Sequence, residues 1–371
     1  MDHVERRLDR LRGATAPRRH NARTIAALAA NPGCERRAVL DSAGVDKQRL
    51  AFQVDFPAQT GQSQFAITRG NVFEAQVKAD GGAELLRLLR ELLDLPIAQA
   101  GYTDLSDGAG NAERHARSRE LLAAAADRTA PGVGTLFDHP LLRLEVAGQR
   151  VYLEPDLIAF QLGGRFHVVE IKSFAVVDGQ ADPGKVSAAA IQSAVYVLAM
   201  REMLVEAGHD PELVSPNVVL VCPRDFSNEP VGALLDVRKQ LLVLRRQLAR
   251  MARVEELLAA LPDGLSFDLE PDADGRPTRS AASLTTALGA VRARYAPECL
   301  AACELARFCR HEAASETATL GRSIREALGG VERVETVLGL ASGELTPAPE
   351  QAEAAALLRT AARLRAEVLA P

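Results

Sequence analysis

The sequence lacks several features that would place it in a familiar class. No uninterrupted apolar run in its 371 residues reaches roughly 18 residues, the length that a membrane span needs. Residues 1–23 are charged and have no apolar centre, unlike a secretory signal. No G-x-x-x-x-G-K-[ST] motif occurs, so ATP-driven unwinding is not expected from this chain. These absences predict a cytoplasmic protein without a membrane partner.

Charge of either sign is not in large excess. The net charge of −5 does not by itself indicate nucleic-acid binding. The basic residues are nevertheless concentrated, because residues 1–40 contain nine arginines and four acids, and residues 236–253 contain six basic residues and one acid. Such stripes can bind a polyanion locally, although they are equally typical of solvated helix faces.

The apolar pattern predicts an α/β core with an extension at each end. We expect a basic helical segment over residues 1–30, the core over 31–311 and a helical appendix over 312–371. The core begins with helices, one of which has a possible break at Gly81–Gly82.

From residue 141 the apolar residues alternate, which is typical of strands. Two strands joined at Ala147–Gly148 are expected, followed by a third strand over about 164–173. A strong helix ending at Gly208 and a buried strand stopped by Pro223 come next. The pattern then predicts one long helix over roughly 229–262.

The stretch "YLEPDLIAFQLGGRFHVVEIKSF" places charged residues where strands should bury apolar ones. Alternation along a strand puts Glu170 and Lys172 on one face. If strands 152–160 and 164–173 form a hairpin, Asp156 approaches Glu170 at a shared end. Two adjacent carboxylates repel unless a cation lies between them, and their oxygens suit Mg²⁺ or Mn²⁺. Lys172 would then hold water or stabilise charge on a phosphate; the alternative is a surface Glu–Lys pair on an edge strand.

The order Pro155-Asp156, thirteen residues, Glu170-Ile171-Lys172 resembles the signature of the PD-(D/E)XK nucleases. That resemblance implies a restriction-endonuclease-like core, with a central mixed sheet flanked by helices. It also implies that Asp156, Glu170 and the Ile171 carbonyl bind the dication.

Two further motifs resemble the RecB-like branch of these nucleases. Gln192 and Tyr196, in "AAAIQSAVYVLAM", match its Q-x-x-x-Y motif and share a helix face. In that branch the pair contacts nucleic acid or orders catalytic groups. The branch also carries a helix with Gly followed four residues later by a metal-binding His, and this chain has Gly70 and Glu74 in those places. Glu74 is therefore the expected third metal ligand, and His115 is the competing candidate.

The five cysteines are unevenly placed. Cys299, Cys303 and Cys309 have C-x3-C-x5-C spacing, which is an incomplete soft-metal site that Cys34 can complete. Zinc bound by these three thiols with Cys34 or His311 is one possibility. Some RecB-like nucleases, including the CRISPR-associated exonucleases and AddB-type enzymes, have one cysteine before the core and three after it. That resemblance implies a [4Fe–4S] cluster on an iron–sulfur helical subdomain. The fifth, Cys222, is expected to be a small buried hydrophobe.

Together these patterns favour a Mg²⁺- or Mn²⁺-dependent deoxyribonuclease in DNA repair or antiviral defence. The resemblance favours exonuclease action on single-stranded DNA, beside a possible helicase or other repair or defence subunit. Two alternatives remain open: a DNA-binding subunit without its own catalysis, and a zinc-stapled scaffold.

Overall fold

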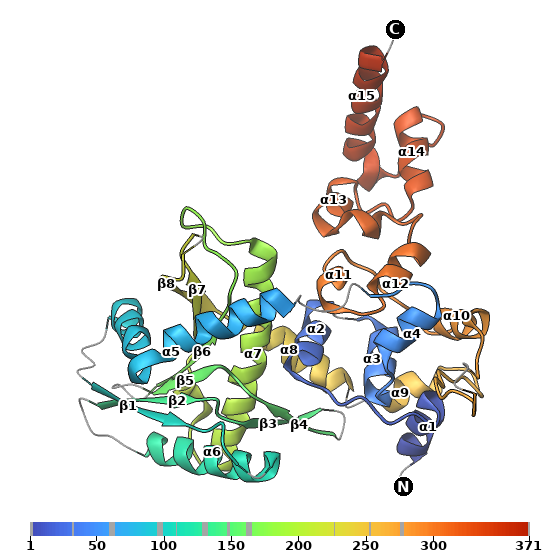
Figure 1. Ribbon diagram of the computed structural model, residues 1–371. Coiled ribbons are helices and arrows are strands. Elements are labelled where there is room, and N and C mark those ends of the chain that lie inside the picture. The colour runs from blue at the N-terminus through green and yellow to red at the C-terminus, as the bar shows by residue number, and fades with distance from the viewer. Residues whose placement is uncertain are drawn as a thin grey trace. The chain divides into compact units, whose positions relative to one another are not determined.

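The computed structural model describes residues 3–31, 33–58, 64–94, 99–108, 110–127, 133–146, 149–160, 165–225, 227–251, 254–274 and 278–369. The chain divides into two compact units, each assembled from separate segments. One unit comprises residues 1–17, 33–60 and 258–371, and its named elements are helical. The other comprises residues 18–32 and 61–257 and contains the β-sheets (Figure 1).

The sheet unit is built on a six-stranded mixed sheet in the order β1-β2-β5-β6-β7-β8. Strands β2, β5 and β6 pair antiparallel, β6 and β7 pair parallel, and β1 and β8 form the two edges. A separate two-stranded sheet pairs β3 with β4. The bounds are β1 Gln99–Asp104, β2 Val133–Asp138, β3 Leu142–Val146, β4 Gln149–Leu153, β5 Leu157–Phe160, β6 Phe166–Ile171, β7 Asn217–Pro223 and β8 Pro230–Asp236.

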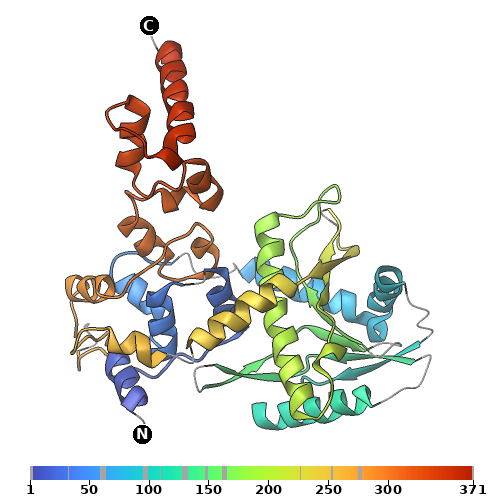
Figure 2. The ribbon, with the colours of Figure 1, turned by 180° about the vertical axis from the view of Figure 1, so that it is seen from behind.

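Helices cover both faces of this sheet, as Figures 1 and 2 show. Helix α5 packs on one face, where Val169 and Ile171 of β6 belong to its apolar cluster. Helices α2, α6, α7 and α8 pack on the other, where Phe166 and Val168 of the same strand join them. The bounds are α2 Ala22–Ala30, α5 Gln64–Leu93, α6 Asn111–Ala126, α7 Pro183–Glu206, η1 Pro211–Leu213 and α8 Arg238–Met251. The predicted α/β class, a mixed sheet flanked by helices, is thus confirmed.

Local sequence explains how α7 is positioned. Asp182 caps its amino terminus by accepting a hydrogen bond from the Lys185 N–H, and Pro183 occupies the first turn, where its missing N–H costs nothing. Among the described residues, α7 has the length and apolar composition of a membrane span, but most of that stretch is buried inside the protein. Core helices have the same property, so α7 here is the central packing helix of the sheet.

Several predicted elements differ from those observed. The predicted helix over 229–262 is wrong, because edge strand β8 occupies its first part and α8 begins only at Arg238. The strand expected over 152–160 is divided between β4 and β5, which belong to different sheets. The break expected at Gly81–Gly82 is present, since residues 79–82 leave helical geometry inside α5. Positive φ angles of 65° and 76° at these glycines suit residues without a Cβ.

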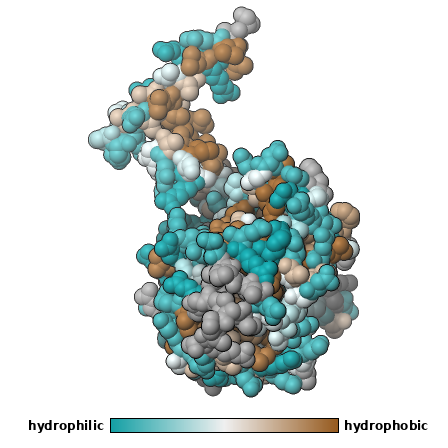
Figure 3. Space-filling model, turned by 90° about the vertical axis from the view of Figure 1, so that its left-hand side faces the viewer, coloured by the Kyte–Doolittle hydropathy of each residue, from teal (hydrophilic) through white to brown (hydrophobic). Residues whose placement is uncertain are grey.

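The second unit is formed by short helices and a C-terminal helical segment. Its helices are α1 His3–Arg12, α3 Glu35–Ala43, α4 Lys47–Gln53, α10 Ala281–Gly289, α11 Cys299–Ala302, α12 Ala306–Glu312, η2 Thr317–Leu320, α13 Arg322–Ala327, α14 Val334–Ser342, η3 Pro349–Gln351 and α15 Ala352–Leu369; α9 Val254–Ala259 lies at the division between the units. Figure 3 shows apolar side chains gathered on the surface of the C-terminal helices. The exposed large apolar residues of α14 and α15 include Leu338, Leu357, Leu364 and Val368.

Candidate functional site

The two halves of the acidic motif meet at one end of β5 and β6. Asp156 immediately precedes β5, and its Oδ2 accepts a hydrogen bond of 2.7 Å from the backbone N–H of Ile171. The antiparallel register, in which Leu157 faces Val169, brings Asp156 beside Glu170. The predicted hairpin geometry thus exists, although the first strand is shorter than expected.

Glu170 is an unusual residue for its surroundings. It is 0% exposed, and neither carboxylate oxygen makes a hydrogen bond of normal geometry within the described residues. Burial, reinforced by the nearby Asp156 carboxylate, raises the pKa of Glu170 to about 8. Burial likewise raises the pKa of Asp156. Two desolvated carboxylates placed together are costly for the fold, which is the condition that a bound cation relieves.

Lys172 supplies one positive charge to this pair. Its Nζ forms an ion pair with Glu170 Oε1, and its side chain is partly exposed just beyond β6. Burial alone would lower the pKa of Lys172, but the Glu170 and Asp156 carboxylates outweigh it and raise that pKa. The ammonium therefore stays charged while remaining accessible to a ligand.

The pair on α7 borders the same acids. Gln192 Nε2 donates a hydrogen bond of 3.0 Å to the Tyr196 hydroxyl, as expected for residues four apart on a helix. Tyr196 is buried, and its pKa is raised first by burial and then by the Glu170 charge. Tyr196 thus lies within electrostatic range of Glu170, and Gln192 fixes its hydroxyl.

The structure separates the two candidates for a third ligand. Glu74, on α5, acts electrostatically on Asp156, Glu170 and Lys172, so it belongs to the same cluster. His115, on α6, is buried elsewhere, with its Nδ1 3.0 Å from the Leu141 carbonyl and its ring against Tyr152. Of the two, Glu74 is placed to serve the acidic site.

Sequence reasoning missed four residues that border Glu74. Lys78 Nζ lies 2.5 Å from Glu74 Oε1, 2.6 Å from Asp138 Oδ1 and 3.1 Å from His139 Nε2. Tyr102 donates a hydrogen bond of 2.6 Å to Asp138 Oδ2. Asp138 is the last residue of β2, a strand whose sequence, "VGTLFD", contains a glycine and alternates only weakly. The one sequence feature that could have indicated a site here is the Asp138-His139 pair directly after "VGTLF".

His139 connects this group to the Asp156 segment. Its backbone N–H donates to the Asp156 carbonyl at 3.3 Å, and its φ of 47° lies in the left-handed region, which is uncommon for histidine. Its Nδ1 lies 3.3 Å from Glu154 Oε1, which Arg114 also contacts at 3.1 Å. The Glu154 contact raises the pKa of His139, and the His139 contact lowers the pKa of Glu154 to about 2.

The chemistry of this group suits a hard dication. Asp156, Glu170 and Glu74 offer oxygen donors, and the fully buried Glu170 carboxylate has one ammonium, Lys172, beside two neighbouring acids. No three His, Cys, Asp or Glu side chains of the described segments already surround one metal position. The residues that would hold Mg²⁺ or Mn²⁺ are therefore Asp156 and Glu170, with Glu74 and the Ile171 carbonyl beside them.

A second candidate site lies in the helical unit, which contains all four of the predicted cluster cysteines. Cys34 caps α3, Cys299 starts α11, Cys303 follows α11 in extended geometry and Cys309 lies on α12. Cys34 and Cys303 both act electrostatically on Cys309, so these three are neighbours. Burial raises the pKa of Cys303 to about 11 and of Cys309 to about 12.

Two buried arginines face these thiols. Arg36 Nη1 donates to Cys309 Sγ at 3.3 Å and forms an ion pair with Glu312. Arg37 acts on Cys303 and Cys34, and its buried Nη2 has no hydrogen-bond partner within the described segments. The other two nitrogens of this guanidinium donate to Asp41 and to the Ala302 carbonyl, so Nη2 is the donor that would suit a group with negative charge, such as a thiolate-ligated metal. His311 is exposed and stacks on Phe56 with ring centroids 4.9 Å apart.

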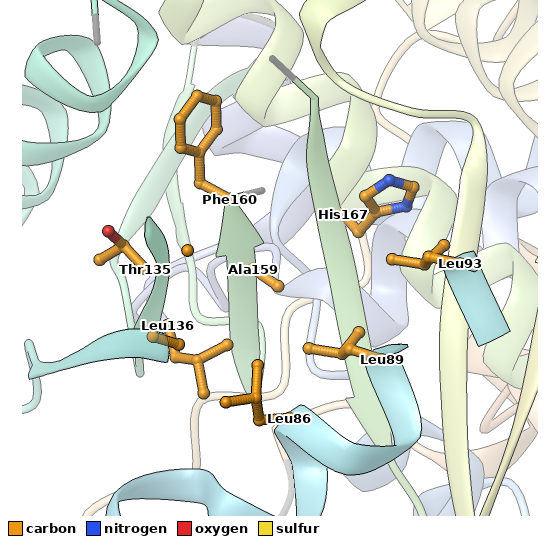
Figure 4. A pocket seen from close by; sticks show the side chains of 10 residues that line it. Leu86, Leu89, Leu93, Thr135, Leu136, Ala159, Phe160 and His167 are labelled. Carbon is orange, nitrogen blue, oxygen red and sulfur yellow. The ribbon is translucent and has the colours of Figure 1, made fainter. Parts of the chain in front are cut away.

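One small pocket in the sheet unit has no part in either site. Figure 4 shows it between α5 and the sheet, lined by Leu86, Leu89 and Leu93 from the helix and by Leu136 and Ala159 from the strands. Its lining is apolar except for Thr135 and His167, and burial lowers the pKa of His167. No carboxylate lines it, so it is a packing gap beneath α5.

The remaining cysteine has a structural place. Cys222 is buried on β7 among apolar side chains, and burial raises its pKa to about 12. It belongs to the sheet unit, whereas the other four cysteines belong to the helical unit.

Comparison with known proteins gives the chain no relative: no protein-family model, no curated protein and no solved structure matches it.

Proposed function

We propose that the chain is a divalent-metal-dependent deoxyribonuclease with a PD-(D/E)XK core. The observation that carries the proposal is Glu170, a fully buried carboxylate that lies beside the Asp156 carboxylate and has the Lys172 ammonium as its counter-charge. Two buried carboxylates share one ammonium in that arrangement, and a bound dication would supply the positive charge that they still lack. The mixed sheet with the motif acids at adjoining strand ends is what the sequence resemblance predicts.

Each residue of the site has a separate role in phosphodiester hydrolysis. A dication held by Asp156 and Glu170, with Glu74, would polarise the phosphate and lower the pKa of a nearby water. The Lys172 ammonium, partly exposed, holds the attacking water and stabilises the charge that develops on the phosphoryl oxygens. Water adds to phosphorus, the P–O bond to the departing strand breaks, and the leaving oxygen takes a proton. Gln192 and Tyr196 orient the substrate strand from α7.

The cysteines support a [4Fe–4S] cluster as a second part of the proposal. Cys34, Cys299, Cys303 and Cys309 would hold it and link α3, α11 and α12, which stabilises segments far apart in sequence. Arg36 and Arg37 would donate to its sulfur atoms. Zinc on the same thiols is the alternative, and purified protein distinguishes the two by metal content and colour.

A nuclease assay on the full chain tests the function. Labelled single-stranded DNA is incubated with protein and Mn²⁺, beside Glu170→Gln, Lys172→Met and, as a matched control, Glu353→Gln on exposed α15. We expect Mn²⁺-dependent cleavage by the wild type and the control, and a loss of about 100-fold or more in both site variants. Equal cleavage by Lys172→Met contradicts the catalytic assignment. A circular substrate and opposite end labels then report endonuclease action and polarity.

A DNA-binding subunit without catalysis is the second candidate, and α8 is the observation that favours it. This helix carries Arg238, Lys239, Arg245 and Arg246, with Leu242 exposed among them. Retained binding of single-stranded DNA with no cleavage under any divalent cation supports this candidate, with a helicase or another repair or defence subunit supplying the chemistry.

A further inference from the structure

Lys78 is the least exposed cation near the candidate metal site. Its side chain is 8% exposed, and its Nζ lies between Glu74 Oε1 at 2.5 Å and Asp138 Oδ1 at 2.6 Å. The ring nitrogen Nε2 of His139 lies 3.1 Å away on a third side. Since an ammonium group has three donors and no acceptor, these three contacts use all of them.

The other contacts of Asp138 and His139 leave one polar atom of each side chain directed at Lys78. Asp138 Oδ2 already accepts from Tyr102, so its Oδ1 is left for the ammonium. His139 Nδ1 faces the Glu154 carboxylate, and its Nε2 lies 3.1 Å from Lys78 Nζ and 3.4 Å from Glu74 Oε1; in the neutral ring with the proton on Nδ1, Nε2 accepts from Lys78. The surrounding groups therefore form a built pocket for one positive charge.

We propose that Lys78 is a resident cation that takes the place of a second metal ion, so that the chain binds one dication, at Asp156 and Glu170. This inference rests on the proposed function. Glu74 Oε1 and Asp138 Oδ1 lie 2.5 Å and 2.6 Å from Lys78 Nζ, so a second dication held by these two carboxylates would need the position that the ammonium occupies. An ammonium at that position repels a dication directly and occupies its ligands.

The same contacts give Lys78 a positioning role toward the bound ion. The Glu74 charge acts on Asp156 and Glu170. Lys78, four residues later and one turn along the same helix, donates to Glu74 Oε1 and fixes its position. Lys78 thus decides how Glu74 is shared between the resident ammonium and the dication. Removing the ammonium while keeping both carboxylates should create a second cation site.

Counting bound Mn²⁺ on the full chain tests this directly, by calorimetric titration and by the loss of free-Mn²⁺ signal in electron paramagnetic resonance. Wild type is expected to bind one ion per chain and Lys78→Met two. The charge-balanced double variant Lys78→Met/Asp138→Asn is expected to return to one, since it removes the second carboxylate together with the ammonium. Lys239→Met, the same change on the exposed face of α8, should leave the count at one.

The outcomes separate the two proposals. Two ions on the wild type, or one ion on Lys78→Met, overturns the resident cation while leaving the metal site itself intact. No ion on the wild type, with no change in Glu170→Gln, removes the metal site and therefore the proposed function. If Lys78→Met does not fold by circular dichroism, Lys78→Gln replaces it, and one ion on that variant overturns the inference in the same way.

Discussion

Asp156 Oδ2 accepts a hydrogen bond of 2.7 Å from the backbone N–H of Ile171, while the Asp156 carbonyl accepts one of 3.3 Å from the N–H of His139. One residue therefore ties the end of β2 to the end of β6. The oxygen that accepts from Ile171 belongs to the carboxylate proposed to bind the dication. Substitutions at Asp156 can therefore distinguish its contribution to stability from its contribution to cleavage.

Replacing Asp156 by Asn or Ala separates them. The Asn side chain keeps an oxygen that can accept from Ile171 and removes the repulsion with Glu170, so we expect the metal-free variant to be at least as stable as wild type and to lose cleavage strongly. Ala removes the acceptor and leaves the partly buried N–H without it, which costs about 1–2 kcal/mol. Chemical denaturation and the nuclease assay measure the two effects. Full activity in Asp156→Asn contradicts the assignment of Asp156 as a ligand.

Glu170→Gln should stabilise the metal-free protein, and more at high pH than at low pH. The pKa of Glu170 is raised from 4.5 to about 8 on folding, so the folded state prefers the protonated form. Below the unfolded pKa both states are protonated and no cost arises; as pH rises toward 8 the unfolded state ionises first and stability is lost. The pKa difference sets an upper limit of about 5 kcal/mol.

Thermal unfolding in a chelating buffer measures this effect. We expect Glu170→Gln to melt a few degrees above wild type at pH 8 and at nearly the same temperature at pH 4.5. Adding Mn²⁺ should raise the melting temperature of wild type alone. A variant less stable than wild type at pH 8 shows that the carboxylate is satisfied within the fold.

The sequence was informative where residue types and local spacing decide the structure. Strand alternation predicts that Glu170 lies on one face of the strand and that Val169 and Ile171 lie on the other, and these two residues do pack beneath α5. The helix-face pair Gln192–Tyr196 also follows from spacing alone. Both are properties of a few neighbouring residues.

The sequence was uninformative where strands lie at sheet edges or where distant residues meet. Strand β8, "PVGALLD", is only partly buried and carries adjacent leucines, so it imitates a helix. Edge strand β1 contains Gly101 and alternates poorly. Lys78 and Asp138 are 60 positions apart and lie on different elements, so residue spacing along the chain could not predict their contact.

Cys309→Ser and Cys222→Ser form a matched test of the metal cluster. Both cysteines are buried, but Cys309 adjoins Cys34 and Cys303, whereas Cys222 packs in the sheet unit. Under anaerobic purification we expect wild type and Cys222→Ser to be brown, with broad absorption near about 400 nm and about four iron atoms per chain. Cys309→Ser should lose colour and iron. Colourless wild type with stoichiometric zinc favours the zinc alternative.

The buried ion network beside the cysteines should be necessary for the helical unit to fold. Asp41 is 2% exposed, forms an ion pair with Lys47, and accepts from Arg37 at 3.1 Å. Asp41→Asn leaves two buried cations with one anion fewer, and Glu304, which lies 3.7 Å from Lys47 and is partly exposed, remains as a weaker partner. We expect a loss of about 3–5 kcal/mol, because an uncompensated buried charge is far more costly than a lost surface pair.

Asp263→Asn is the control for this prediction, since Asp263 is fully exposed and lies 3.8 Å from Arg7 in the same unit. Its loss should change stability by less than about 0.5 kcal/mol. Urea unfolding of the full chain, followed by circular dichroism, compares the two variants. Equal midpoints for Asp41→Asn and Asp263→Asn mean that Lys47 and Arg37 find other partners, and that Asp41 does not hold the arginine against the thiols.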